Sequence, residues 1–534
     1  MPKITIDGIE AEFETGESIL QVADRIGIEI PRFCYHKDLR WAGNCRMCQV
    51  EVEKMPKLAI SCATVAADGM VVYTKSPKVV KAVRGVLEFL LLNHPIDCPI
   101  CDQAGECFLQ DYYMRYGLYD SRIPLNDKVK KRKVLRLGDM IVLDTERCVL
   151  CSRCVRFCED VTGSNEFGFS NRGNRTEIGT FYDAVVDNPY AGNLVDICPV
   201  GAITSKDFRF KCRVWFLNTT PSVCPTCSTG CNIYVESKNG LVQRLRPRYN
   251  ADVNKSWICD KGRMSYKLIN DEGRLYQALE KSGSGFQEIS YESAVEKGAQ
   301  KLKDIASKYG NDKILAIASP KGTNEDLYLF KKFFSEVIRT PHISLGETDG
   351  VNNASVMEDK VLRRIDPNPN TVGAGLIGIK ADDGKMTPER VADIINKNGI
   401  KALYLMSPEI LRDGATSQPL RDALKNVDAI IVHSMFVPLS DMPAQIVFPS
   451  ASYAEADGTF TNYAGRVQKI KSAIKRKESV KSHSEIFQDM INKLGGDGKK
   501  LSAPAIFNEL AGVVSAFSSI KFSDIGDTGV QLKL

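Results

Sequence analysis

The sequence predicts an α/β multidomain protein whose N-terminal half is rich in cysteine and whose C-terminal half contains none. All seventeen cysteines lie before residue 260 of the 534-residue chain, which is long enough for several domains. Beyond residue 274, helical stretches such as residues 324–338 alternate with short apolar strands, namely KILAIAS, ALYLMS, AIIVHS and AQIVFPS. This alternation is typical of a doubly wound, mostly parallel sheet.

Composition excludes several classes of protein. A net charge of +5 on this length makes no case for nucleic acid as a partner. No apolar run reaches the roughly 18 residues of a membrane helix, so we expect no direct membrane insertion. The opening MPKITIDGIEAEF alternates like a strand and not like a signal or transit peptide, so we expect a cytoplasmic chain. The basic run KVKKRK at 128–133 is either a solvated loop or a docking edge for an acidic partner.

In a reducing compartment, clustered cysteines indicate metal sites and not disulfides. The first group is Cys34, Cys45, Cys48 and Cys62, spaced C-x10-C-x2-C-x13-C. An expected hairpin (KITIDG and AEFETG) and an amphipathic helix (SILQVADRIGI) surround it. That local order is typical of a plant-type [2Fe–2S] ferredoxin with a β-grasp fold, although the first gap is longer than the plant-type spacing. A zinc site is the alternative.

The stretch NHPIDCPICDQAGEC supplies the second group, His94, Cys98, Cys101 and Cys107. Zinc also accepts three thiolates and one imidazole. The residue types alone therefore leave both zinc and an iron–sulfur cluster open.

The third group combines CVLCSRC (Cys148, Cys151 and Cys154) with a Cys-Pro pair in DICPVGAIT (Cys198). Three cysteines on one short loop and a remote Cys-Pro are the pattern of a [4Fe–4S] cluster. Cys158 completes a local CxxCxxCxxxC and competes with Cys198 as the fourth ligand. The tight turn Cys-Pro-Val-Gly favours Cys198.

The fourth group is Cys224, Cys227 and Cys231 in CPTCSTGC, with Cys259 in WICDKGR. Its spacing, C-x2-C-x3-C-x27-C, resembles the N-terminal [4Fe–4S] motif of the molybdopterin oxidoreductase family. Fifteen cysteines and His94 then make four sets of four ligands, with Cys158 and Cys212 left over. Among three iron–sulfur sites, the His94 site is most economically a [4Fe–4S] cluster, which gives one [2Fe–2S] and three [4Fe–4S] clusters in all.

Particular strings sharpen the resemblance, among them CRMCQVEVE, HPIDCPICDQAGEC, GNLVDICPVGAIT and NRGNRTEIGT. Over residues 1–270 the chain resembles the large iron–sulfur subunit family of respiratory complex I, and the remainder resembles it weakly. The resemblance implies an electron-transfer subunit of an NADH:quinone oxidoreductase, with no complete active site and no catalytic residue in this chain. It implies a peripheral position on the cytoplasmic face of the inner membrane.

The partners that this resemblance implies are the FMN/NADH-binding subunit with its small [2Fe–2S] subunit, and the quinone-branch subunits of the peripheral arm. The cluster of the fourth group is expected to lie off the main path. The same N-terminal module also occurs in NAD-linked formate dehydrogenases and electron-bifurcating complexes, which are the alternative. A zinc-stapled scaffold protein is a third hypothesis from a different class.

The segment PSASYAEADGTFTNYAGRVQ (449–468) resembles the molybdopterin family at Glu455, Gly458, Thr459, Asn462, Gly465 and Arg466, and TDGVNNA (348–354) is a weaker match. No cysteine follows Cys259 as a metal ligand, although Ser or Asp ligation stays open. Only 66 residues follow Gln468, which is short for the terminal barrel of that family. We therefore expect a shortened scaffold without molybdopterin.

These patterns divide the chain into five expected domains. They are a [2Fe–2S] ferredoxin-type domain (1–78), a one-His/three-Cys [4Fe–4S] segment (79–139), a ferredoxin-like [4Fe–4S] domain (140–216), a molybdopterin-oxidoreductase-type [4Fe–4S] domain (217–273) and a shortened molybdopterin-oxidoreductase-like domain (274–534).

Overall fold

The computed structural model describes residues 1–182, 184–283, 285–346, 358–380, 386–407, 417–438, 444–496 and 498–533. The chain forms two compact units, Met1–Leu217 and Asn218–Leu534. The motif TDGVNNA lies outside the described residues. No helix in the described ranges is long and apolar enough to cross a membrane.

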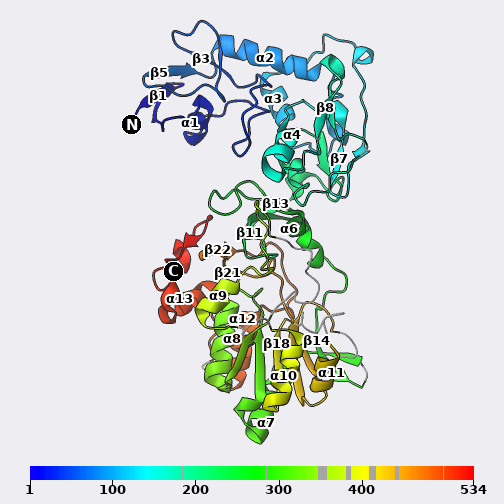
Figure 1. The fold of residues 1–534 in the computed structure, drawn as a ribbon, viewed down its shortest axis with the longest axis vertical. Helices are drawn as coiled ribbons and strands as arrows, with labels where there is room; N and C mark the ends of the chain where they lie inside the picture. The colour runs from blue at the N-terminus through cyan, green and yellow to red at the C-terminus, as the bar shows by residue number, and fades with distance from the viewer. Residues whose placement is uncertain are drawn as a thin grey trace. The chain divides into compact units, whose positions relative to one another are not determined.

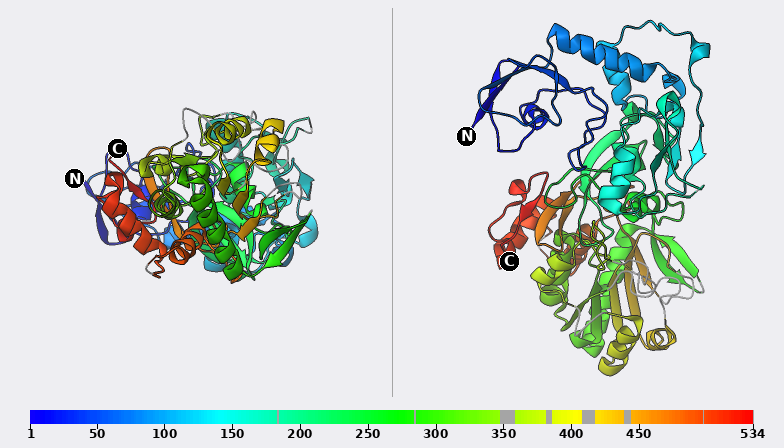
Figure 2. Two further views of the ribbon diagram at one scale, coloured as in Figure 1. Left: turned by 90° about the horizontal axis from the view of Figure 1, so that it is seen from below. Right: turned by 45° about the horizontal axis from the view of Figure 1, so that its top comes forward.

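The first lobe of unit 1 is a five-stranded sheet in the order β2-β1-β5-β3-β4. β1 pairs in parallel with β5 and antiparallel with β2, which is the arrangement expected of a β-grasp domain. Inward residues of alternating strands, such as Ile4, Ile6 and Val50, pack against Leu20 of α1 (Figure 2). The elements are β1 Lys3–Ile6, β2 Ile9–Glu12, α1 Ile19–Arg25, β3 Gln49–Val52, β4 Ala59–Ile60 and β5 Met70–Tyr73.

The rest of unit 1 is built from short elements with long loops between them (Figure 1). α2 begins at Pro77, where the N-cap Ser76 accepts a hydrogen bond from Val79 N–H. Two small sheets follow, β10-β7-β6 and β8-β9. The elements are α2 Pro77–Leu91, α3 Phe108–Tyr116, β6 Leu135–Arg136, β7 Ile141–Leu143, α4 Arg153–Phe157, β8 Gly168–Ser170, β9 Glu177–Gly179, α5 Asn193–Ile197 and β10 Ile203–Ser205.

Unit 2 begins with an antiparallel sheet, β11-β12-β13, followed by the short helix α6. A seven-stranded sheet in the order β15-β14-β20-β19-β18-β16-β17 follows. β17, β16, β18, β19 and β20 are parallel to one another, and only β14 and β15 run antiparallel. The predicted α/β class with a mostly parallel sheet is confirmed. The elements are β11 Asn218–Val223, β12 Asn232–Lys238, β13 Leu241–Pro247, α6 Asp260–Met264, β14 Ala278–Ser282, β15 Gly285–Ile289, β16 Ile314–Ala318, β17 His342–Leu345, β18 Ala402–Met406, β19 Ala429–Ser434 and β20 Ile446–Pro449.

Helices cover both faces of this sheet (Figure 1). Alternate residues of β16 point to opposite faces, so Ala316 packs with α7, α8 and α12, whereas Leu315 packs with α10 and α11. The expected helix over 324–338 is α8, which continues as a π-helical turn over Phe333–Ile338. The helices are α7 Tyr291–Tyr309, α8 Asn324–Lys332, α9 Thr371–Ile377, α10 Pro388–Asn398, α11 Gln418–Leu424, α12 His483–Lys493 and α13 Ala503–Val513.

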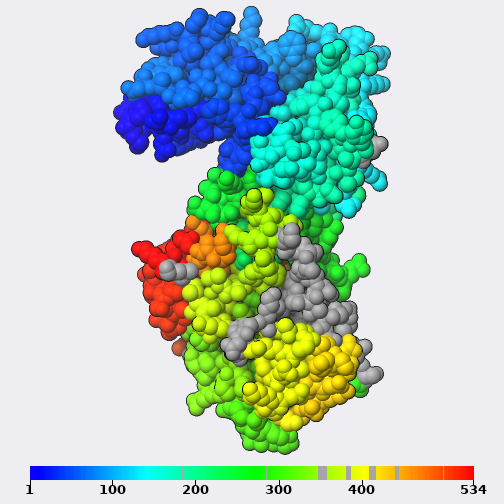
Figure 3. All heavy atoms as spheres, viewed as in Figure 1, coloured from blue at the N-terminus to red at the C-terminus, as the bar shows by residue number. Residues whose placement is uncertain are grey.

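A small antiparallel sheet, β21-β22-β23, completes unit 2. Its strands are β21 Gly458–Thr461, β22 Arg466–Ile470 and β23 Val530–Gln531. The C-terminal segments, orange and red in Figure 3, lie against the green and yellow-green part of the same unit, where α13 contacts α8.

The carboxyl of Glu325, near the start of α8, is fully buried and accepts hydrogen bonds from Thr459 N–H (2.8 Å) and Thr459 Oγ1 (3.0 Å). Burial raises the pKa of Glu325 from 4.5 to about 8, so the folded chain holds a proton that the unfolded chain releases. The free energy of unfolding should therefore fall as pH rises from about 4.5 to 8, by up to about 1.4 kcal/mol per unit from this group.

The Glu325→Gln variant should lose that part of the slope, because the amide stays neutral. Denaturant unfolding of wild type and variant across this pH range measures the difference. Equal slopes in both proteins would contradict the assignment.

Candidate metal centres

The four thiols of the first group meet in the loops around β3. Cys34 shares side-chain hydrogen bonds with Cys45 and Cys62, and Cys48 shares one with Cys62. These contacts lower the pKa of Cys34 and raise that of Cys62. Cys34, Cys48 and Cys62 are buried, whereas Cys45 is half-buried. The predicted set is thus brought together at one place in the β-grasp lobe.

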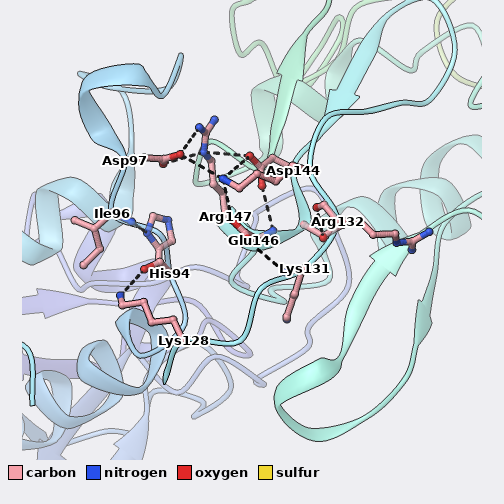
Figure 4. Close-up of polar contacts among 11 residues, drawn as sticks. His94, Ile96, Asp97, Lys128, Lys131, Arg132, Asp144, Glu146 and Arg147 are labelled. Carbon is pink, nitrogen blue, oxygen red and sulfur yellow. Dashed lines mark hydrogen bonds and ion pairs between the residues drawn. The ribbon is translucent and has the colours of Figure 1, made fainter. Parts of the chain in front are cut away.

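His94, Cys98, Cys101 and Cys107 line one cavity of about 140 Å³. Burial lowers the pKa of His94 to about 4, so its imidazole is neutral at pH 7, which is the form that binds metal. Its Nδ1 accepts a hydrogen bond from Ile96 N–H at 3.1 Å (Figure 4). Iron bound through Nε2 would require the ring proton on Nδ1, so this bond would have to open.

Cys148, Cys151, Cys154 and Cys198 line a small cavity whose other walls are mostly apolar, with Leu143, Ile178 and Leu194 among them. Burial raises the pKa of Cys148 and Cys198 to about 12. Because iron binds thiolates, filling this site would release protons.

Cys158 does not line this cavity; it is fully buried elsewhere, with its Sγ 3.8 Å from Glu166. Glu166 in turn accepts hydrogen bonds from Ser164 and Asn188. The geometry therefore separates Cys198 from Cys158, as the Cys-Pro turn favoured.

The fourth group lies in unit 2, where Cys224 N–H donates to Cys231 O at 2.8 Å. The four thiols influence one another, and burial raises the pKa of Cys224 to about 12. Gly262, at the start of α6, fits against them: a Cβ there would lie 2.9 Å from Cys224 Sγ and 3.4 Å from Cys259 Sγ. Its N–H also donates to Cys259 Sγ at 3.3 Å.

No group of three or more His, Cys, Asp or Glu side chains in the described ranges is already placed to hold one metal ion. The second and third groups instead surround a space. A cluster of several irons is the kind of occupant that this arrangement fits.

Two buried arginines of α4 join the loops of the first and third groups. Arg156 Nη2 donates to Cys34 O at 2.5 Å and to Cys151 O at 3.3 Å. Arg153 donates to Tyr35 O at 2.5 Å and to Ile197 O at 2.9 Å. Each guanidinium thus holds a ligand-bearing loop of the β-grasp lobe against the ferredoxin-like segment.

The turn Cys198-Pro-Val-Gly separates the second and third groups by a single layer of backbone. Val200 and Ala202 line the cavity of the third group, whereas Gly201 between them lines that of the second. A Cβ on Gly201 would lie only 2.3 Å from Cys101 Sγ. The two sites are therefore neighbours, and only glycine fits at their common wall.

Four family models match successive parts of the chain. They are a 2Fe-2S iron-sulfur cluster binding domain (2–77), the NADH-ubiquinone oxidoreductase-G iron-sulfur binding region (84–122), the NADH-quinone oxidoreductase subunit 3 ferredoxin-like domain (138–204) and the molybdopterin oxidoreductase Fe4S4 domain (217–271). A molybdopterin oxidoreductase model matches residues 350–493.

The G subunit of the NADH-quinone oxidoreductase of Rickettsia bellii is 41% identical over 337 residues, which cover 63% of this chain and 48% of that protein. The 78 kDa mitochondrial subunit of NADH-ubiquinone oxidoreductase from Neurospora crassa is 41% identical, covering 60% and 46%. The chain is a relative of the G subunit of NADH-quinone oxidoreductase. It spans about half the length of these relatives.

A second protein of this kind, from Rhizobium meliloti, is 39% identical over 64% of this chain and 40% of its own length. Among solved structures, an NAD+-reducing [NiFe]-hydrogenase shows 28% identity and a TM-score of 0.37, covering 40% of this chain and 91% of the other.

Several of the residues that match the molybdopterin family make internal contacts. Glu455 binds Arg274 Nη2 at 2.8 Å and Ser452 N–H at 2.8 Å. Asn462 Nδ2 donates to Thr229 O at 3.2 Å, beside the fourth group of cysteines. Thr459 binds Glu325, and Arg466 forms an ion pair with Asp252. This segment braces the fold around the fourth site.

A cavity of about 560 Å³ lies at the carboxyl ends of the parallel strands of unit 2. Ser407, Ser434 and Ser450 follow or end neighbouring strands there, and Thr226 of the fourth cysteine loop also lines it. Open α/β sheets bind ligands at this edge. No cysteine is among the described residues that line the cavity.

His94→Cys replaces a neutral imidazole by a thiolate and adds one negative charge. If His94 is a ligand, a cluster should persist at the second site and its midpoint potential should fall, because added negative charge disfavours the reduced form. A redox titration followed by EPR measures the shift. An unchanged midpoint with full iron content would remove His94 from the ligand set.

Three features of the sites were not predicted from the sequence: Gly201, the arginines of α4, and the contacts of residues 128–133. Gly201 and Arg153 lie inside the cysteine motifs, so their position beside a ligand was the available signal. The basic run is neither of the two alternatives considered, because Lys128, Lys131 and Lys133 contact groups within unit 1.

Proposed function

We propose that this chain carries electrons within an NADH-quinone oxidoreductase, from an FMN/NADH-binding subunit and its small [2Fe–2S] partner toward the quinone-branch subunits. The ligands would be Cys34, Cys45, Cys48 and Cys62 for a [2Fe–2S] cluster; His94, Cys98, Cys101 and Cys107, Cys148, Cys151, Cys154 and Cys198, and Cys224, Cys227, Cys231 and Cys259 for three [4Fe–4S] clusters. When bound, such clusters accept and release single electrons.

The observation that carries this proposal is the linkage of three sites within unit 1. Arg156 links the loops of the first and third sites, and the turn around Gly201 links the third and second. One isolated site could serve stability alone, but three adjoining sites suit transfer from one to the next. The protein's part is to hold each thiol, exclude water and fix spacing.

For unit 2 we propose a scaffold that holds the fourth cluster and binds no molybdopterin. The donors around its cavity are hydroxyls, Lys261, Lys321 and His483, and the sequence offers no cysteine beyond Cys259. The cavity therefore lacks the thiolate that a molybdenum site would most readily use.

The direct test is to mix the purified chain with its FMN/NADH-binding partner and follow the visible absorption after adding NADH. Bleaching of the cluster absorption within the turnover time of the complex is the expected result. A chain that stays fully oxidised beside an active partner would contradict the proposal.

A further inference from the structure

A buried ion pair joins the loops of the second and third sites (Figure 4). Asp97 precedes Cys98, and Arg147 precedes Cys148. Arg147 Nε donates to Asp97 Oδ1 at 3.1 Å, and Nη2 donates to Oδ2 at 2.7 Å. A two-point contact of this kind fixes orientation as well as distance. The two side chains are 5% and 16% exposed, so water competes with them weakly.

Further charges surround this pair. Lys133 Nζ lies 2.8 Å from Glu146, 3.5 Å from Asp97 and 3.7 Å from Asp144. Arg147 Nε is also 3.4 Å from Asp144 Oδ2. Three carboxylates thus enclose two cations, and each buried charge has an opposite partner.

Residues 128–133 tie the same two loops together along the backbone. Lys128 Nζ donates to His94 O at 2.6 Å, and Lys131 N–H donates to Glu146 Oε1 at 3.1 Å. Thr145 N–H donates to Arg132 O at 3.1 Å. The segment therefore runs from the His94 ligand loop to the loop that precedes Cys148.

We propose that Asp97 and Arg147 are positioning residues that fix the separation of the second and third clusters and thereby the rate of electron transfer between them. The inference rests on the proposed function of the two sites. Electron tunnelling slows steeply with distance, and these two residues are each adjacent in sequence to a ligand. A small relaxation of either loop would therefore reach the cluster that it holds.

Asp97→Asn in the full chain tests this role. The amide keeps the shape and one acceptor but loses the charge, so the two-point contact opens. The magnetic interaction between the two reduced clusters, measured by EPR relaxation, should weaken. Freeze-quench reduction of the second cluster should slow several-fold, with the iron content of both sites retained.

Glu88→Gln is the matched control. Arg122 also binds Glu88 with two contacts, through Nε at 2.6 Å and Nη2 at 2.5 Å, but this pair lies on the surface of α2 with Arg122 75% exposed. It touches no ligand loop, so coupling and rate should stay at wild-type values. Arg147→Lys should fall between wild type and Asp97→Asn, because lysine keeps the charge but loses the fork.

Wild-type coupling and rate in an Asp97→Asn chain with full iron would overturn the proposal. So would loss of iron from Asp97→Asn and Arg147→Lys alike, since the pair would then serve folding and not spacing. Absence of cluster signals from the wild-type chain itself would instead contradict the proposed function.

Discussion

Cys151→Ala should remove the third cluster and stop electron flow between the first and second sites. The side chain lines the cavity with Cys148, Cys154 and Cys198, and its carbonyl accepts from Arg156. Iron content should fall by about four atoms per chain. Because metal binding is folding energy, residues 140–210 should also unfold more readily. Iron analysis and NADH-driven reduction of the second site measure both effects.

Cys158→Ala is the matched control for this variant. It removes a buried thiol from the same segment, but one that faces Glu166 and not the cavity. Iron content should stay at the wild-type value. Loss of four irons from Cys158→Ala, with Cys151→Ala unaffected, would reverse the ligand assignment.

Gly201→Ala should disrupt the second site although it adds a single methyl group. The new Cβ would lie 2.3 Å from Cys101 Sγ and 3.1 Å from Gln103 Cβ, so Cys101 or the turn must move. Overpacking of this kind costs about 1–3 kcal/mol, and here it also displaces a proposed ligand. We expect weakened or absent EPR signals from the second cluster and intact signals from the first and fourth.

Gly85→Ala, in α2 of the same unit, is the control, because a Cβ there meets no atom within 4 Å. It should leave every cluster in place and stabilise the helix by up to about 1 kcal/mol. If both variants retained all clusters with unchanged spectra, the close packing of Gly201 against Cys101 would be wrong.

The cysteine spacing predicted the architecture of unit 1 because ligand motifs are local in sequence. CVLCSRC must form one loop, and KITIDG must be followed by a turn, whatever the rest of the chain does. The parallel sheet of unit 2 was predictable for a similar reason: its buried strands, such as ALYLM, are short and continuously apolar.

Contacts between distant segments were not predictable in the same way. Nothing in KVKKRK shows that Lys133 faces Asp97, Asp144 and Glu146, since these acids are ordinary surface residues by type. The sequence also could not show that Gly201 closes on Cys101, because the two lie 100 residues apart and only the folded turn brings them together. Residues between sites are therefore seen only in the structure.

The central claim is that four clusters occupy this chain. Anaerobic analysis of iron, sulfide, zinc and molybdenum in the purified full chain tests it most directly. Four clusters predict about fourteen iron atoms per chain and no stoichiometric zinc or molybdenum. Zinc in place of iron would make the chain a metal-stapled scaffold, and stoichiometric molybdenum would show that unit 2 is a catalytic domain; either result would contradict the claim.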